Sequence, residues 1–157
     1  IDWNINRTFF NDYTALKWSW FANTAITKSE YLKSDVPNIK GKEVEFVPLI
    51  NLKTGFNMGY KNFLTTIQYT HLSSQFTNAN NAKTDLNDNT YGIFGEIPAY
   101  SVIDLSASYR YKKWKIEGGI NNLTNHHYFT RRATGYPGPG IIPSETRNFY
   151  TTLEFNF

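Results

Sequence analysis

Residues 100–111 read Tyr-Ser-Val-Ile-Asp-Leu-Ser-Ala-Ser-Tyr-Arg-Tyr, and apolar and polar side chains alternate along this stretch. The more apolar set is Ile103, Leu105, Ala107, Tyr109 and Tyr111, and the alternate set is Val102, Asp104, Ser106, Ser108 and Arg110. Successive side chains of an extended strand point to opposite faces. The stretch therefore predicts a β-strand with one apolar and one polar face.

The same alternation recurs in six further segments, and no segment predicts a helix. These segments are Ile1–Phe9, Leu16–Ile26, Pro48–Tyr60, Asn62–His71, Trp114–Asn125 and Asn148–Phe157. In the last of them, the apolar face carries Phe149, Leu153, Phe155 and Phe157. We therefore expect an all-β fold of seven antiparallel strands.

The connections between these strands alternate in length. The short ones are Phe10–Ala15, Lys61 and Lys112-Lys113, and the long ones are Leu32–Val47, Leu72–Ala99 and His126–Thr146. Loops of this length without secondary structure are uncommon in compact soluble domains. Short turns at one end and long loops at the other are typical of a transmembrane antiparallel β-barrel.

Composition supports a barrel over a soluble β-sandwich, which is the alternative with the same alternation. The 157 residues carry a net charge of +3, 17% aromatic side chains and no cysteine, and the mean hydropathy is -0.50. The lack of cysteine excludes disulfides, thiolate zinc sites and cysteine nucleophiles. No apolar run approaches the roughly 20 residues of a membrane helix. Aromatic residues such as Tyr60 and Trp114 gather at strand ends, as in the interfacial girdles of membrane barrels.

Seven strands are too few for a closed bacterial barrel, because single-chain barrels have an even number starting at about 8. An open sheet in lipid leaves two edges of unpaired backbone groups, at a high free-energy cost. We therefore expect residues 1–157 to be the C-terminal part of a larger barrel, with Phe157 at the periplasmic face.

Three segments carry a resemblance to a known family. Residues 118–130 read Gly-Gly-Ile-Asn-Asn-Leu-Thr-Asn-His-His-Tyr-Phe-Thr, and the other two are Gly41–Pro48 and Ile97–Leu105. Together they resemble, in order and spacing, the C-terminal region of TonB-dependent outer-membrane receptors. The resemblance covers roughly Leu16–Phe157, and the last long loop, Tyr128–Ser144, resembles that of the ferric-dicitrate-type receptors.

The resemblance implies a 22-stranded barrel filled by an N-terminal plug domain that lies outside residues 1–157. It implies an outer-membrane location in a Gram-negative bacterium, among lipid and lipopolysaccharide. It also implies uptake of a ferric chelate, with ferric citrate as the leading cargo and no bound cofactor, driven by TonB through the missing N-terminal region. The final strand, with Phe149, Leu153, Phe155 and Phe157, would be presented to the barrel-assembly machinery. Another siderophore, haem or an oligosaccharide is the alternative cargo, and a barrel enzyme or adhesin is the alternative class.

The candidate ligand residues are Arg131, Arg132 and Tyr136 in the last long loop. A guanidinium offers a planar fork of donors that matches a carboxylate, and citrate is a polycarboxylate. The alternative is that the two arginines bind lipopolysaccharide phosphates or brace the loop. Adjacent residues of an extended segment point apart, so we expect only one of them to face the lumen. Tyr136 begins a Pro-Gly array that predicts a shaped turn.

Other chemistry finds little support in the sequence. His126 and His127 are adjacent, so in an extended segment they point to opposite faces and do not readily share a metal ion. No serine or other nucleophile has an oriented base, so no enzyme is predicted. The positive charge gathers partly around the short turns, and no nucleic-acid-binding motif is present.

Overall fold

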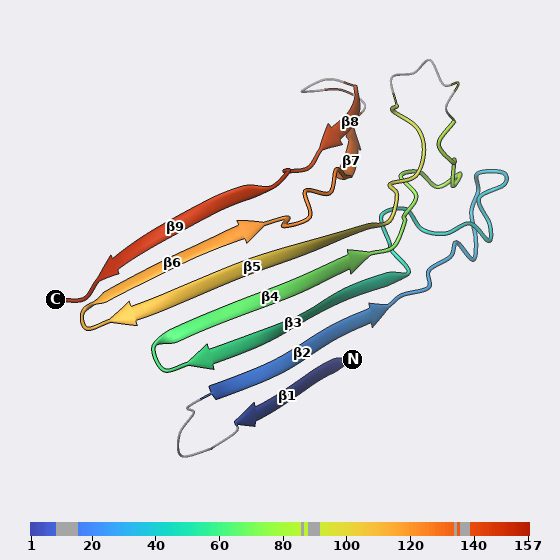
Figure 1. Cartoon of the computed structure of the whole chain (residues 1–157). Coiled ribbons are helices and arrows are strands. Elements are labelled where there is room, and N and C mark those ends of the chain that lie inside the picture. The colour runs from blue at the N-terminus through green and yellow to red at the C-terminus, as the bar shows by residue number, and fades with distance from the viewer. Residues whose placement is uncertain (9–15, 86, 88–91, 134, 136–138) are drawn as a thin grey trace.

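The fold is a curved seven-stranded antiparallel β-sheet, with a separate two-stranded hairpin and the long loops gathered at one end (Figure 1). The computed structural model describes residues 1–8, 16–85, 87, 92–133, 135 and 139–157. Seven strands follow one another in the order β1-β2-β3-β4-β5-β6-β9, and each pairs with the next. Their bounds are Asp2–Thr8 (β1), Leu16–Ile26 (β2), Ile50–Tyr60 (β3), Phe63–Leu72 (β4), Tyr100–Tyr111 (β5), Trp114–Asn121 (β6) and Asn148–Phe155 (β9).

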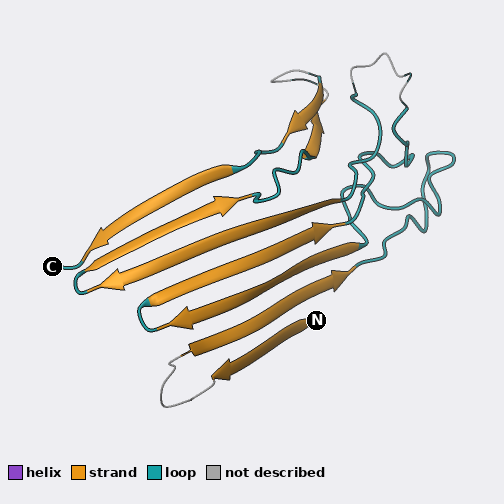
Figure 2. Ribbon diagram, in the orientation of Figure 1, coloured by secondary structure: helices purple, strands orange, loops and turns teal. Residues whose placement is uncertain are grey.

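The described residues contain strands and loops but no helix, as Figure 2 shows. Helices that are long and apolar enough to cross a membrane are accordingly absent from the described part of the chain. The all-β prediction is therefore confirmed. Strands β2 to β5 have 10 to 12 residues, which is close to the 9–11 or so that a tilted strand needs to cross a bilayer.

The register places side chains of one kind in rows across the sheet. One row joins Trp20, Phe56, Ile67, Leu105, Ile120 and Phe149. The neighbouring row, on the opposite face, joins Ser19, Asn57, Thr66, Ser106 and Gly119. The apolar rows stay exposed, with Phe149 at 70% and Leu153 at 66%. Such exposure suits a face that is covered by lipid rather than water.

The buried apolar residues lie partly among the loops, because a one-layer sheet encloses no core of its own. Ile97 is fully buried and Ile39 is 5% exposed, and both belong to long loops. Ile97 is held by two backbone hydrogen bonds with Gln75, of 2.8 and 3.1 Å. The loops therefore pack into a body of their own at the long-loop end of the sheet.

Three details differ from the sequence expectation. Strand β6 ends at Asn121 and not Asn125, because Asn122 turns the chain with φ at 52°. The tight turn after β3 is Lys61-Asn62, since Tyr60 pairs directly with Phe63. The last long connection, expected to be loop, contains the hairpin β7 (Phe129–Ala133) and β8 (Gly140–Pro143). Its pairing shifts register between Phe129 and Arg131, and this irregularity interrupts the alternation that would have revealed a strand.

Candidate functional site

Asn122 fastens the last long loop to the end of the sheet. Its side chain donates to the carbonyls of His126 (2.8 Å) and Glu145 (3.3 Å), and it accepts from the backbone N–H of His126 (2.8 Å). Its own N–H donates to the Asp104 carboxylate at 2.9 Å. Asn122 is 3% exposed and adopts a left-handed conformation that Asn tolerates better than most residues. One amide thus joins both ends of the loop that contains the β7–β8 hairpin.

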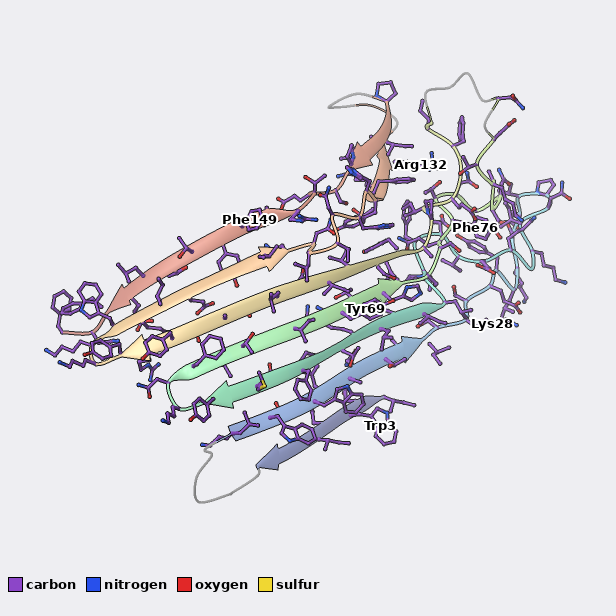
Figure 3. All side chains as sticks on the ribbon, viewed as in Figure 1. Trp3, Lys28, Tyr69, Phe76, Arg132 and Phe149 are labelled. Carbon is purple, nitrogen blue, oxygen red and sulfur yellow. The ribbon has the colours of Figure 1, made fainter. Side chains whose placement is uncertain are left out.

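Arg132 connects the hairpin to loop 73–99. Its guanidinium donates to the carbonyl of Gly92 at 2.6 Å, to the carbonyl of Glu96 at 2.7 and 3.1 Å, and to the Thr84 hydroxyl at 3.0 Å. It also lies 5.0 Å from the centre of the Phe129 ring. With 9% exposure, the Arg132 side chain is buried, and Figure 3 shows it at the long-loop end.

A glycine makes room for this contact. A Cβ at Gly95 would lie 2.7 Å from the Thr84 hydroxyl and 3.1 Å from an Arg132 nitrogen, and the φ of Gly95 is +121°. A side chain there would strain the backbone and crowd the guanidinium. The absence of a side chain at Gly95 therefore leaves space for the Arg132 guanidinium.

Arg131, next along β7, is exposed while Arg132 is buried. Adjacent strand residues point to opposite sides, so the two arginines have different environments. The Arg131 side chain lies at the surface of the hairpin. Tyr136, the third candidate from the sequence, lies outside the described residues.

Loop 27–49 is joined in turn to loop 73–99. The Asn81 side chain accepts from the N–H of Glu43 and donates to its carbonyl, both at 2.8 Å. The N–H of Phe46 donates to the carbonyl of Phe76 at 2.8 Å. We call loop 27–49, the described residues of loop 73–99 and the β7–β8 hairpin the loop cluster. The Asn81 side chain joins loop 73–99 to loop 27–49, and the Arg132 side chain joins the hairpin to loop 73–99.

Within loop 27–49, the Tyr31 hydroxyl donates to the Glu45 carboxylate at 2.6 Å. This hydrogen bond lowers the pKa of Glu45, with help from a backbone hydrogen bond. The same bond is the main cause that raises the pKa of Tyr31. The loop contact is therefore complete when Glu45 is ionised and Tyr31 is protonated.

Tyrosine and histidine rings lie where the loop cluster joins the sheet. Tyr100 stacks on Tyr128 with centroids 4.5 Å apart, and His126 stacks on Tyr128 at 6.1 Å. Nearby, Ser101 lies 2.9 Å from both the Tyr69 hydroxyl and the His71 Nδ1. No group of three potential metal-ligating side chains occurs among the residues that the structure describes.

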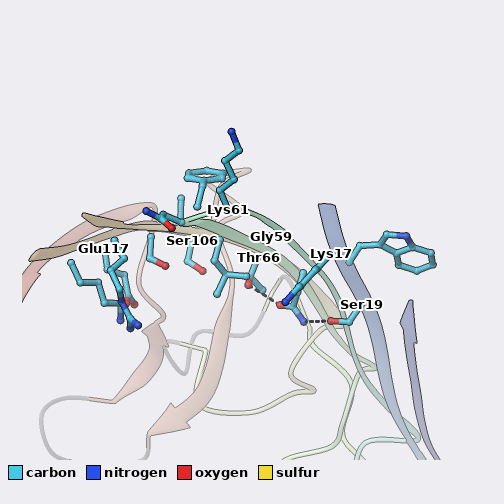
Figure 4. A pocket seen from close by; sticks show the side chains of 16 residues that line it. Lys17, Ser19, Gly59, Lys61, Thr66, Ser106 and Glu117 are labelled. Carbon is cyan, nitrogen blue, oxygen red and sulfur yellow. Dashed lines mark hydrogen bonds and ion pairs between the residues drawn. The ribbon is translucent and has the colours of Figure 1, made fainter. Parts of the chain in front are cut away.

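The polar face of the sheet forms a hollow of about 800 Å³ toward the short-turn end (Figure 4). Thr66 donates to Asn57 at 2.7 Å, and Asn57 donates to Ser19 at 3.0 Å, so one hydrogen-bonded chain crosses three strands. Lys115 pairs with Glu117 two residues along the same strand, at 2.9 Å. This wall presents hydroxyls, amides and paired charges to whatever fills the lumen.

The sequence analysis predicts that four apolar residues of the final strand are presented to the barrel-assembly machinery, and these residues lie at the end of the chain. Phe149, Leu153 and Phe155 lie on the exposed apolar face of β9, an edge strand of the sheet, and Phe157 follows that strand. Phe155 packs against Trp114 with centroids 4.6 Å apart, and Phe157 meets Phe155 edge-on at 5.2 Å. The chain end thus carries an aromatic cluster at the short-turn side.

Sequence reasoning missed the structural roles of Asn81 and Asn122. The signal for Asn122 was present in the Asn-Asn-Leu-Thr-Asn motif, but its hydrogen-bond partners lie up to 23 residues away. Asn81 pairs with Glu43, 38 residues away. Neither partner follows from local periodicity, because loop contacts have no regular spacing.

Comparison with solved structures places the sheet among known barrels. The unliganded ferric citrate transporter FecA has 21% identity and a TM-score of 0.79 over 89% of this chain. The ferric yersiniabactin uptake receptor FyuA from Yersinia pestis has 17% identity and a TM-score of 0.69 over 92%. The ferric-catecholate import receptor Fiu from E. coli K12 has 14% identity and a TM-score of 0.65 over 99%. The chain spans only 20 to 22% of the length of these proteins.

A comparison with curated proteins gives no match. The family model for the TonB dependent receptor-like β-barrel matches residues 1–123, which is most of the chain. The shared fold, the alternating short turns and long loops, and this match agree with one another. This chain belongs to the TonB-dependent receptor β-barrel family.

Proposed function

We propose that this chain forms the C-terminal part of an outer-membrane receptor of a Gram-negative bacterium that takes up a ferric chelate, with ferric citrate as cargo. Energy for uptake would come from TonB through an N-terminal region outside residues 1–157. Further strands would pair with the free edges of β1 and β9, because unpaired backbone groups are costly in lipid. The family match and the similarity to a ferric citrate transporter and a ferric yersiniabactin uptake receptor support this class of function.

The observation that carries the proposal is the joined loop cluster with Arg131 at its surface. Arg132 and Asn81 hold three loops together beyond the polar wall of the sheet. Arg131 is exposed on this body and offers the donors that a carboxylate of ferric citrate needs. We assign Arg131 the ligand contact and Arg132 the bracing of the site. Tyr136 remains a candidate for stacking on the chelate.

Growth with ferric citrate as the sole iron source tests the proposal in a strain that lacks other routes for this chelate. The full-length receptor that contains this chain should support growth, and it should fail in a TonB-deficient strain. Arg131→Ala should raise the required ferric citrate concentration at least tenfold, since a charge-assisted hydrogen bond contributes about 1.5–3 kcal/mol. Lys40→Ala, which also removes an exposed cation from the loop cluster, is the matched control and should leave growth unchanged.

Three results would contradict different parts of the proposal. Normal growth of the Arg131→Ala strain would remove this residue from the ligand site. Growth that continues without TonB would contradict energised transport and favour the enzyme or adhesin class. Similar structures include a receptor for ferric enterobactin and a copper transporter. Growth on ferric enterobactin but not on ferric citrate would therefore transfer the proposal to the catecholate cargo.

The exposed face of β9 supports a proposal about partners. Phe149, Leu153, Phe155 and Phe157 are all large, apolar and exposed, and β9 has an unpaired edge in this chain. We assign this strand to recognition by the barrel-assembly machinery, and the loop cluster to the side that faces lipopolysaccharide.

A further inference from the structure

Three lysines occupy two adjacent tight turns at the short-turn end of the sheet. Lys61 belongs to the β3–β4 turn, and Lys112 and Lys113 form the β5–β6 turn. All three are exposed, and these two turns contain no acidic residue. A hydrogen bond of 3.0 Å from the N–H of Arg110 to the carbonyl of Asn62 holds the first turn against β5. The two turns therefore present one positively charged edge.

Two of these lysines place their ammonium groups beside tyrosine rings of the apolar face. The Lys61 Nζ lies 5.2 Å from the centre of the Tyr60 ring, and the Lys112 Nζ lies 5.4 Å from the Tyr111 ring. Both tyrosines belong to the apolar rows. Lys61 lies at the margin of the hollow, and Figure 4 shows its side chain extending away from those of Ser106 and Thr66. The ammonium groups are thus placed where a bilayer meets water, beside interfacial tyrosines.

The apolar face carries a groove of about 400 Å³ on the same strands as the second turn. Its floor is a row of small residues from three neighbouring strands, Ala107, Gly118 and Thr151. The pair Leu105 and Ile120 forms one wall, and the pair Tyr109 and Ile116 forms the other. The groove exists because three small residues stand between rows of large ones.

The groove and the lysines have the right separation for the two parts of one lipid. Ala107 precedes Lys112 by five residues, which is about 17 Å along an extended strand and about 12 Å of depth for a strand tilted by about 45°. Half of the hydrocarbon core of a bilayer is about 15 Å thick. With the lysines at the level of the headgroups, the groove therefore lies at the depth reached by the acyl chains of the same leaflet.

We propose that the lysine edge and this groove form a binding site for an anionic phospholipid on the short-turn side of the membrane. Lys61, Lys112 and Lys113 hold the phosphate of a headgroup with net negative charge, such as phosphatidylglycerol, and the groove accepts an acyl chain. Three cations select an anionic over a zwitterionic headgroup, because each basic residue near a membrane surface favours anionic lipid by roughly fivefold.

Native mass spectrometry of the full-length receptor in detergent tests this site with added phosphatidylglycerol and phosphatidylethanolamine of identical acyl chains. The unchanged protein should bind phosphatidylglycerol at least tenfold more tightly. A variant with Lys61→Gln, Lys112→Gln and Lys113→Gln should lose this preference. The matched control, Lys33→Gln with Lys40→Gln and Lys42→Gln, removes the same charge from loop 27–49 and should keep it. Equal binding of the two lipids by the unchanged protein would overturn the proposal.

A second variant tests the groove separately. Ala107→Leu fills the floor and should weaken the binding of both lipids severalfold while the preference for phosphatidylglycerol remains. Soluble glycerol phosphate should not compete with the lipid, because it has no acyl chain for the groove. Unchanged lipid binding by Ala107→Leu, competition by glycerol phosphate at equal concentration, or equal loss of preference in the lysine control would each contradict the assignment.

Discussion

Replacement of Arg132 by alanine should release the β7–β8 hairpin from loop 73–99. The substitution removes hydrogen bonds to the carbonyls of Gly92 and Glu96 and to the Thr84 hydroxyl, all made by a side chain that is only 9% exposed. Counting each of these three acceptors at about 1–1.5 kcal/mol gives about 3–4.5 kcal/mol. Loss of the contact with Phe129 adds to this cost.

Amide hydrogen exchange in the full-length receptor measures this loss as a change in local opening. A decrease of about 3 kcal/mol corresponds to exchange about 100-fold faster in residues 92–97. Arg131→Ala is the matched control, because it removes the same side chain from the exposed side of the strand. Its effect on exchange in this segment should stay under about threefold. Arg132→Lys should give an intermediate rate, since one ammonium cannot reach all three acceptors.

Unchanged amide exchange in residues 92–97 of the Arg132→Ala receptor would contradict this prediction. Equal acceleration in the Arg131→Ala receptor would also contradict it, because the effect would then come from the loss of one positive charge and not from the lost hydrogen bonds. In addition, faster exchange should be confined to the loop cluster and should not extend to the middle of β3 or β4. A uniform increase across the sheet would indicate global destabilisation instead of a lost brace.

Three further predictions concern Asn122 directly after β6, Gly55 in β3 and Glu45 in loop 27–49. Asn122→Ala should destabilise the last loop by about 3–4 kcal/mol in exchange experiments, and Asn122→Gly, which permits the left-handed backbone, should cost about 1 kcal/mol less. Gly55→Ala should lower the unfolding midpoint in detergent, because its Cβ would lie 2.5 Å from the Phe21 ring; Phe21→Ala should recover most of this loss in the double variant. Glu45→Gln should lower the pKa of Tyr31, because the Glu45 carboxylate is the main cause that raises this pKa. Carbon-13 NMR of tyrosine measures the pKa, and Tyr31→Phe assigns the signal.

The pH dependence of the Tyr31–Glu45 contact follows from the two directions. The pKa of Glu45 is lowered, so its contribution is present above the ordinary glutamate pKa and disappears as the pH falls through the lowered value. The pKa of Tyr31 is raised, so its contribution is present below the ordinary tyrosine pKa and disappears as the pH rises through the raised value. The contact should therefore be complete between about pH 5 and pH 9.

The sheet was predictable because its information is local. Alternation in residues 100–111 identifies a strand without knowledge of any partner, and the tight turns at Lys61 and Lys112 then impose antiparallel neighbours. Gly55 and Gly119 mark a limit of this reading. They pair with Phe21 and Tyr150, whose rings lie over them. This pairing depends on the strand register, which the sequence alone does not reveal.

The fold class, the two faces of the sheet, the alternation of turns and loops, and the family could all be predicted from the order of the amino acids. It also pointed to Arg131 and Arg132, but it could not separate an exposed cation from a buried brace. The folded chain separates the two roles, because it brings Arg132 to Thr84, which is 48 residues away in the sequence. Strand faces follow a period of two, whereas contacts between loops depend on where the folded chain brings distant backbone carbonyls together.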